Sequence, residues 1–91
     1  MQYLWETSDE INMIVANNVK RLRKRLGISQ SRLSEISGVS LGSIKRFERS
    51  GNISLLSLTK LAMSLDSTED IKMLFTRVPY KSIEEVIREN K

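Results

Sequence analysis

The chain has 91 residues, of which 15 are Lys or Arg and 11 are Asp or Glu, so its formal net charge at pH 7 is +4. It contains no Cys and no His, which excludes a disulfide framework, thiolate chemistry and imidazole catalysis, and no metal site or cofactor is expected. This length allows one small domain with a thin core, and the basic excess favours a polyanionic partner.

The amino-terminal stretch MQYLWETSDE is acidic and lacks the basic and then apolar order of a signal peptide. No apolar stretch approaches the roughly 20 residues that a membrane span needs. We therefore expect a cytoplasmic protein without a membrane partner. Tyr3, Leu4 and Trp5 are expected to form a hydrophobic flap over the helices. The alternative is an anchor for a protein partner, because aromatic residues concentrate at interfaces.

Apolar residues recur with helical spacing along the whole chain, and no alternating strand pattern is found, which predicts an all-α fold. The first helix is predicted over residues 9–26, with Thr7 or Ser8 as its N-cap and Gly27 as its end. Its apolar face is predicted to consist of Ile11, Val15, Val19, Leu22 and Leu26, which are spaced by 4, 4, 3 and 4 residues.

Three more helices are predicted over residues 30–37, 41–49 and 55–65, each preceded by a serine that can cap it. Their inward-facing residues are predicted to be Leu33 and Ile36 in the second helix, Ile44 and Phe47 in the third, and Leu58, Leu61, Ala62 and Leu65 in the fourth.

A short fifth helix is predicted over residues 69–75, with Ile71, Leu74 and Phe75 as its apolar residues. After Pro79, a capping box of Ser82 and Glu85 begins a last helical segment with Ile83, Val86 and Ile87 on one edge. The chain is therefore expected to form a single domain, 1–91, with a compact five-helix core at about 9–75 and a short helical extension at 76–91.

The junction of the second and third helices consists of only Gly38, Val39 and Ser40. Gly38 can take the left-handed conformation that ends a helix, Val39 can fill the gap between the two helices, and Ser40 can cap the next helix. This short turn with a glycine is typical of a helix-turn-helix.

The third helix has a cationic outer face. When Ile44 and Phe47 point inward, a rotation of about 100° per residue places Gly42, Lys45, Arg46 and Arg49 outward. A purely structural helix has little reason to carry Gly42, because glycine costs roughly 0.5–1 kcal/mol relative to alanine. Since the major groove of DNA admits a helix, this face is predicted to bind duplex DNA.

The residues predicted to contact DNA fall into two sets. Those expected to read bases are Ser40, Leu41, Gly42, Ser43 and Arg46, and those expected to bind phosphates are Gln30, Lys45, Arg49, Asn52, Lys20 and Lys24. Gln30 has a second expected role, in which its amide braces a side chain that contacts a base. For the basic run at residues 20–25, the alternative is an ordinary solvated helix face.

The segment VKRLRKRLGISQSRLSEISGVS, together with Ile44, Phe47, Glu48 and SLLSLTKLAMSLD, resembles the phage repressor and Cro type helix-turn-helix domain of the XRE family over about residues 15–65. The resemblance implies a structural ion pair between Arg23 and Glu48. We expect a homodimeric repressor of a bacterium or phage, associated with the nucleoid, that binds a pseudo-palindromic operator, because a single half-site reads few bases. Its dimer surface is expected at Met73, Phe75, Val78, Tyr80, Val86 and Ile87. The order Arg49-Ser50-Gly51 departs from the family, which often has Asn or Thr and then Gly after the glutamate.

Two other functions stay open. The ending FTRVPYKSIEEVIRENK resembles the small antitoxins encoded beside HipA-like kinase toxins, which bind operator DNA and hold the toxin. A third interpretation is an interaction adaptor that has kept the fold and lost DNA binding. An enzyme is not expected, because the chain shows no nucleophile–base pair, no phosphate-binding glycine loop and no metal-ligand spacing.

Overall fold

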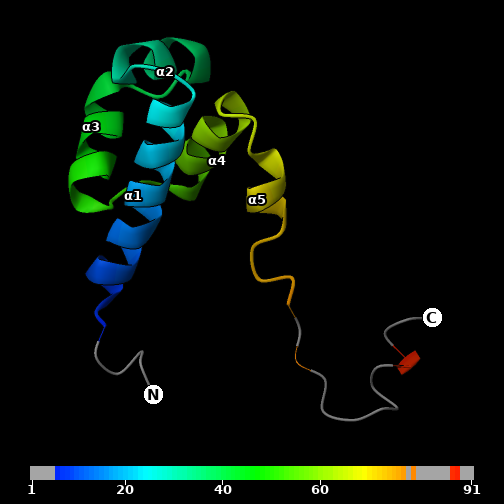
Figure 1. The fold of residues 1–91 in the computed structure, drawn as a ribbon. Helices are drawn as coiled ribbons and strands as arrows, with labels where there is room; N and C mark the ends of the chain where they lie inside the picture. Colours follow the sequence, from blue (N-terminus) through cyan, green and yellow to red (C-terminus); the bar gives the residue numbers. More distant parts are fainter. Residues whose placement is uncertain (1–5, 78, 80–86, 89–91) are drawn as a thin grey trace.

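The computed structural model describes residues 6–77, 79 and 87–88. Its elements are five helices, α1 (Ser8–Arg25), α2 (Gln30–Ser37), α3 (Leu41–Ser50), α4 (Leu55–Ser64) and α5 (Thr68–Lys72) (Figure 1). The described residues contain no strand, so the all-α prediction is confirmed. The first four helices begin and end within one residue of the predicted bounds, whereas α5 ends three residues early. The Ser82–Glu85 capping box and the Tyr3–Trp5 flap lie outside the described residues.

The helix starts are set by side-chain caps. Thr7, rather than Ser8, caps α1, and it forms a capping box with Glu10, in which the Glu10 N–H donates to Thr7 Oγ1 at 3.1 Å. Ser29, Ser40 and Ser54 each accept a hydrogen bond from the N–H three residues later. Each cap satisfies a backbone donor that a helix start otherwise leaves unpaired, so the chain has one clear beginning for each of α1 to α4.

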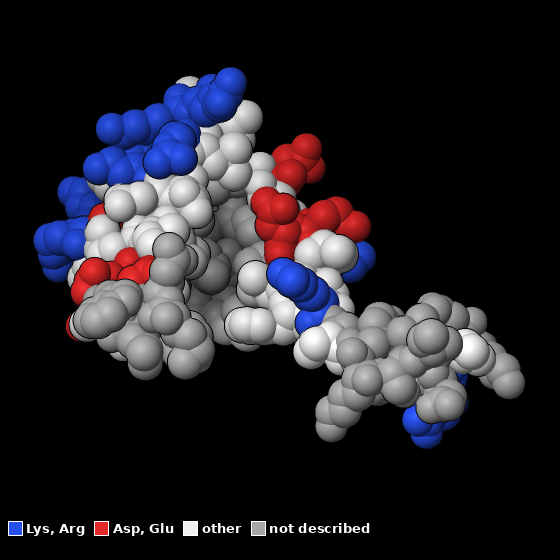
Figure 2. All heavy atoms as spheres, turned by 60° about the horizontal axis from the view of Figure 1, so that its bottom comes forward, with Lys and Arg blue, Asp and Glu red and all other residues white. Residues whose placement is uncertain are grey.

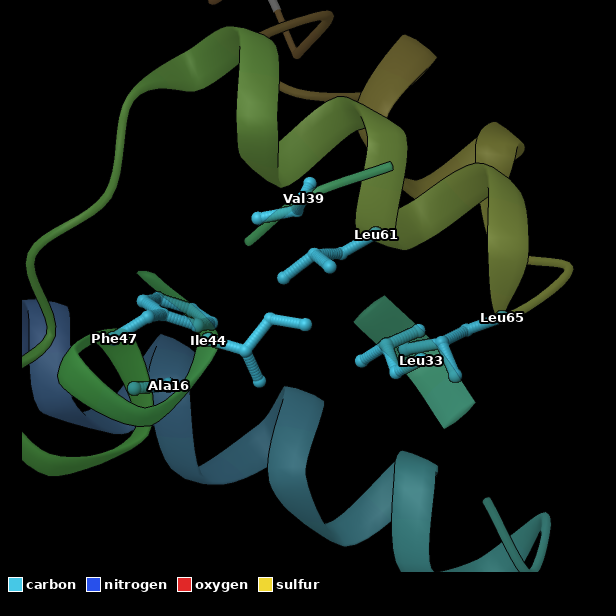
Figure 3. Packing of buried hydrophobic residues seen from close by; sticks show 7 residues of the cluster. All are labelled: Ala16, Leu33, Val39, Ile44, Phe47, Leu61 and Leu65. Atoms are coloured by element: carbon cyan, nitrogen blue, oxygen red, sulfur yellow. The ribbon is translucent and has the colours of Figure 1, made fainter. Parts of the chain in front are cut away.

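The core lies where α1 to α4 meet, and Figure 3 shows Ile44 of α3 near its centre. Its fully buried large side chains are Phe47, Leu33, Ile44 and Leu61, and Ala16, Val39 and Leu65 complete the cluster. Burial of each large apolar side chain contributes about 1.5–3 kcal/mol. Because Ile44 and Phe47 supply two of these four side chains, α3 is held by its inner face and its outer face remains free.

The predicted apolar face of α1 is confirmed only in part. Val19 and Leu22 are partly buried and pack against the core, whereas Ile11 and Val15 are 44% and 40% exposed and Leu26 is also exposed. Ala16 and Arg23, which the prediction left out of that face, are buried. The reason is local: small Ala16 permits close approach of a neighbouring helix, and Arg23 is drawn inward by an acidic partner on α3.

The prediction that Ile36 of α2 faces inward beside Leu33 is wrong, because Ile36 is 41% exposed and lines a surface groove with Met63 of α4. The fifth helix ends at Lys72, three residues before its predicted end, so Leu74 and Phe75 lie beyond it and are exposed. Phe75 has a φ of +60° and is 96% exposed. In Figure 1 the end of α5 leads away from the bundle.

Candidate nucleic-acid interface

The turn between α2 and α3 has the predicted three-residue form. Gly38 ends α2 with a φ of +76°, and its N–H donates to the Ser34 carbonyl at 3.0 Å. Val39 is buried in the core, and its carbonyl accepts a hydrogen bond from Ser34 Oγ at 2.7 Å. Its N–H donates to Ser37 Oγ at 3.1 Å. Both backbone groups of the central turn residue are thus satisfied by α2, which fixes the angle at which α3 leaves the turn.

The outer face of α3 carries the predicted residues. Gly42, Lys45, Arg46 and Arg49 are exposed, opposite buried Ile44 and Phe47. In Figure 2 most of the visible Lys and Arg side chains gather along one side of the molecule, and a few others lie near the acidic side chains of the opposite side. Lys45, Arg46 and Arg49 make the outer face of α3 cationic.

The first turn of α3 contains a hydroxyl pair that sequence reasoning missed. Ser40 Oγ accepts from the Ser43 N–H at 3.1 Å as the cap, and it also donates to Ser43 Oγ at 2.7 Å. Ser40 is exposed, whereas Leu41 and Ser43 are half-buried. The spacing of a cap and the residue three positions later was the signal for this contact. Because Ser40 donates its hydroxyl proton to Ser43, the Ser43 hydroxyl proton is the one that the pair can still donate to another partner.

An ion pair between α1 and α3 holds the basic helix from behind. Arg23 Nε donates to Glu48 Oε2 at 2.7 Å, and Arg23 Nη2 donates to Glu48 Oε1 at 2.9 Å, so the contact is bidentate. Arg23 Nη1 also donates to the Ile28 carbonyl at 2.9 Å. Both side chains are buried. The pairing implied by the family resemblance is present, and it connects α1, α3 and the loop after α1.

The charge state of Glu48 follows from opposing effects. Burial alone raises the pKa of this carboxyl, but hydrogen bonds from Arg23 and Gln30, and the charges of Arg23 and then Lys20, together outweigh it. The pKa of Glu48 therefore lies below its ordinary value. The carboxylate stays ionised at neutral pH, as the bidentate contact with Arg23 requires.

Gln30, the first residue of α2, takes part in the same network. Its Nε2 donates to Glu48 Oε1 at 2.9 Å, so the amide is braced by α3. This contact uses one of the two protons of the Gln30 amide, and the amide oxygen accepts no hydrogen bond within the network. The network thus joins the start of α2 to the middle of α3, two segments that the sequence places 18 residues apart.

The remaining phosphate candidates lie beside this network or at the end of α3. Lys24 is exposed on α1, and Lys20 is half-buried there, close enough to Glu48 to affect its pKa. Asn52 is exposed just beyond α3, and its N–H donates to Ser50 Oγ at 3.3 Å. Ser50 Oγ itself donates to the Arg46 carbonyl at 2.6 Å. The departure from the family order therefore builds a turn that Ser50 organises.

Gly51 ends α3 with a φ of +82°, and its N–H donates to the Phe47 carbonyl at 2.8 Å. A Cβ at this position would lie 3.0 Å from the Asn12 carbonyl carbon and from Asn12 Cβ. The end of α3 thus packs directly against the backbone of α1, and only glycine meets both the conformational and the steric demand.

Within residues 6–77, 79 and 87–88, no group of three or more acidic, His or Cys side chains is arranged to hold a metal ion. No helix in that part of the chain combines the length and the apolar character needed to cross a bilayer.

Three features together define a DNA-binding helix-turn-helix module. They are the short turn between α2 and α3, the buried ion pair of Arg23 with Glu48, and the exposed cationic face of α3. A family profile described as Helix-turn-helix matches residues 19–71, more than half of the chain. The chain belongs to this family, as an XRE-type helix-turn-helix regulator. The comparisons with curated proteins and with solved structures found no match. The family is a DNA-binding regulatory one and not a catalytic one.

Proposed function

We propose that the protein is a homodimeric repressor that binds a pseudo-palindromic operator with α3 in the major groove. The observation that supports this most directly is the exposure of Lys45 and Arg46 on the side of α3 opposite its buried residues. A helix of 10 residues is about 15 Å long. It fits a groove about 12 Å wide when its first turn points at the base edges.

Within this proposal the predicted residues divide by position. The first turn and the residue one turn later read bases, namely Ser40, Leu41, Gly42, Ser43 and Arg46. The residues around them bind phosphates, namely Gln30, Lys45, Arg49, Asn52, Lys20 and Lys24. Arg46 forks onto a guanine, since a guanidinium matches the two acceptors of that base. Gln30 combines its brace on Glu48 with a phosphate contact at the positive end of α2.

Dimerisation is proposed through the end of α5 and the extension at 76–91. Met73, Phe75 and Ile87 are exposed apolar side chains in the described part of this region. Val78, Tyr80 and Val86, which the sequence adds to the same surface, lie outside the described residues. A single module reads few bases, and two modules about one helical turn apart read a longer, symmetric site. The whole chain then acts as one unit in the cytoplasm, at the nucleoid.

The test is footprinting on the DNA upstream of the protein's own gene, followed by titration of the protected duplex. Affinity for that duplex is expected to fall with added salt. The logarithm of the association constant falls with the logarithm of the salt concentration, with a slope of about −0.9 for each phosphate neutralised. Arg46→Ala is expected to cost about 1–3 kcal/mol and to relax the preference at one base pair. Lys60→Ala, which changes an exposed lysine on α4, is the matched control. No protection, and equal low-salt affinity for wild type and Arg46→Ala, would favour the interaction adaptor.

The antitoxin function is the second candidate, because the ending FTRVPYKSIEEVIRENK resembles the antitoxins of HipA-like kinases. It requires a toxin partner in addition to DNA. A kinase-like gene beside this one, whose product co-purifies with the full-length protein and sharpens its footprint, would favour the antitoxin over a repressor acting alone.

A further inference from the structure

The turn between α2 and α3 holds its central residue, Val39, at three points. The Val39 side chain is 5% exposed and belongs to the core cluster, where Figure 3 shows it near Leu61. The Val39 N–H donates to Ser37 Oγ at 3.1 Å, and the Val39 carbonyl accepts from Ser34 Oγ at 2.7 Å. These two hydroxyls, which we call the serine clamp, therefore bind both backbone polar groups of one turn residue.

Ser34 uses its hydroxyl differently from most serines inside a helix. Such a serine commonly donates to the carbonyl four residues earlier in the same helix. Ser64 of α4 does so, since its Oγ donates to the Lys60 carbonyl at 3.1 Å. The Ser34 hydroxyl instead donates to the carbonyl of Val39, five residues later and beyond the end of α2. It therefore stabilises the turn and not its own helix.

Both members of the serine clamp weaken the helix that carries them. Helix α2 has only 8 residues, and serine is a poorer helix former than alanine because its hydroxyl competes for backbone groups. Ser34 and Ser37 are both half-buried. Alanine at either position would favour the helix and would remove the present partner of one polar group of Val39. The two serines thus give up helix stability for a fixed turn.

The serine clamp acts on the direction in which α3 begins. The Val39 carbonyl and the Ser40 nitrogen belong to one planar peptide unit, so a hydrogen bond to that carbonyl orients the whole plane. Only the φ and ψ angles of Ser40 lie between this plane and Leu41, the first residue of α3. Ser40 is itself fixed by its cap, in which its Oγ accepts from the Ser43 N–H at 3.1 Å. The clamp and the cap together therefore orient the first turn of α3.

The first turn of α3 depends on this support because packing holds it only weakly. None of Leu41, Gly42 and Ser43 is buried, and the first buried residue of the helix is Ile44. Contacts with base edges are directional, and side chains that make such contacts must be held within about 0.5 Å of their working positions. The buried residues of α3 fix the roll of the helix, whereas the clamp fixes the place of its first turn.

We propose that Ser34 and Ser37 are positioning residues, which place the first turn of α3 for reading bases without contacting DNA themselves. This inference rests on the proposed function, in which α3 enters the major groove. Phosphate contacts carry no sequence information, whereas base contacts do. Loss of the serine clamp is therefore expected to weaken binding to the operator and to leave binding to other DNA nearly unchanged.

The serine clamp itself is tested on the free, full-length protein by hydrogen exchange measured with NMR. The Val39 amide is expected to exchange about ten-fold faster in Ser37→Ala than in wild type, because its hydrogen bond is lost. Ser64→Ala removes a half-buried hydroxyl that bonds within α4, and this matched control is expected to leave the Val39 exchange unchanged. Equal Val39 exchange in wild type and Ser37→Ala would overturn the proposal, whatever DNA the protein binds.

The effect on DNA is measured with two duplexes, the operator found by footprinting and a duplex of the same length with its sequence scrambled. The double variant Ser34→Ala, Ser37→Ala is expected to bind the operator about ten-fold more weakly than wild type, because two ordering hydrogen bonds are lost. Its affinity for the scrambled duplex is expected to stay within about two-fold of wild type. Ser64→Ala is expected to match wild type on both duplexes. Circular dichroism at the binding temperature checks that each variant is folded.

The two affinities separate a positioning role from a structural one. An equal fall on both duplexes would limit the two serines to a role in folding, and an unchanged operator affinity would show that the first turn is placed without them. Either result overturns this inference and leaves the proposed function standing. Wild-type protein that binds the two duplexes equally would overturn the proposed function, and this inference with it.

Discussion

Helices α3 and α1 use opposite kinds of side chain to face the core. α3 buries large apolar residues, Ile44 and Phe47, and exposes its cations. α1 instead buries Ala16 and the cation Arg23, has Val19 and Leu22 only partly buried, and leaves Ile11 and Val15 44% and 40% exposed. A bidentate ion pair and one small residue therefore share with the apolar side chains in fixing the rotation of a long helix.

The largest expected effect comes from breaking that ion pair. Glu48→Ala leaves Arg23 buried without its partner, which is expected to lower the free energy of unfolding by about 3–5 kcal/mol. Urea unfolding followed by circular dichroism measures it. Arg32→Ala removes half of the exposed Arg32–Glu35 pair and is expected to cost less than about 1 kcal/mol. Equal losses in the two variants would show that the buried pair does not orient α1.

Gly38 and Gly51 share a left-handed backbone conformation but differ in their surroundings. Gly38 has φ +76° with no atom within 4 Å of an added Cβ, whereas Gly51 has φ +82° and faces the Asn12 backbone at 3.0 Å. Gly38→Ala is expected to cost about 1–2 kcal/mol from conformation alone. Gly51→Ala is expected to cost about 2–4 kcal/mol, because strain and overpacking add. Thermal unfolding would contradict this if the two variants lost the same stability.

Acid titration isolates the electrostatic part of the α1–α3 contact. The pKa of Glu48 is lower in the folded protein than in the unfolded chain, where it is ordinary. Its contribution to stability is therefore complete above the unfolded pKa of about 4.3 and is lost as the pH falls from there toward the folded pKa. Between pH 6 and 3, Glu48→Gln is expected to show a shallower loss of stability than wild type. Parallel pH profiles would argue against this role of Glu48.

The sequence was sufficient for much of the fold because its signals were local. A serine before each of α2, α3 and α4, and Gly38 between two helices, determine bounds through contacts within a few residues. The rotation of α1 was not predictable from its apolar spacing, because Arg23 is buried by a residue 25 positions away. The family resemblance implies that ion pair, but the apolar spacing of α1 contains no sign of it.

The candidate site divides in the same way. The outward direction of Lys45 and Arg46 follows from helix geometry once Ile44 is inward, and the structure agrees. The contact of Gln30 with Glu48 joins two helices through a tertiary hydrogen bond. It was not predicted, because the sequence left open a phosphate contact or a brace for a base-contacting side chain, and Glu48 is buried. Which bases each side chain contacts depends on a DNA partner and stays a prediction.

The smallest expected effect is the most specific test of the outer face of α3. Gly42 lies inside the helix with no atom within 4 Å of an added Cβ, so Gly42→Ala is expected to stabilise the protein by about 0.5–1 kcal/mol. The same methyl group points to the side where the DNA wall is proposed to approach, so operator affinity is expected to fall although the melting temperature rises. Lys60→Ala, at an exposed position on α4, serves as the binding control. A variant that gains both stability and affinity would mean that Gly42 does not face the groove, and that α3 meets DNA through a different side.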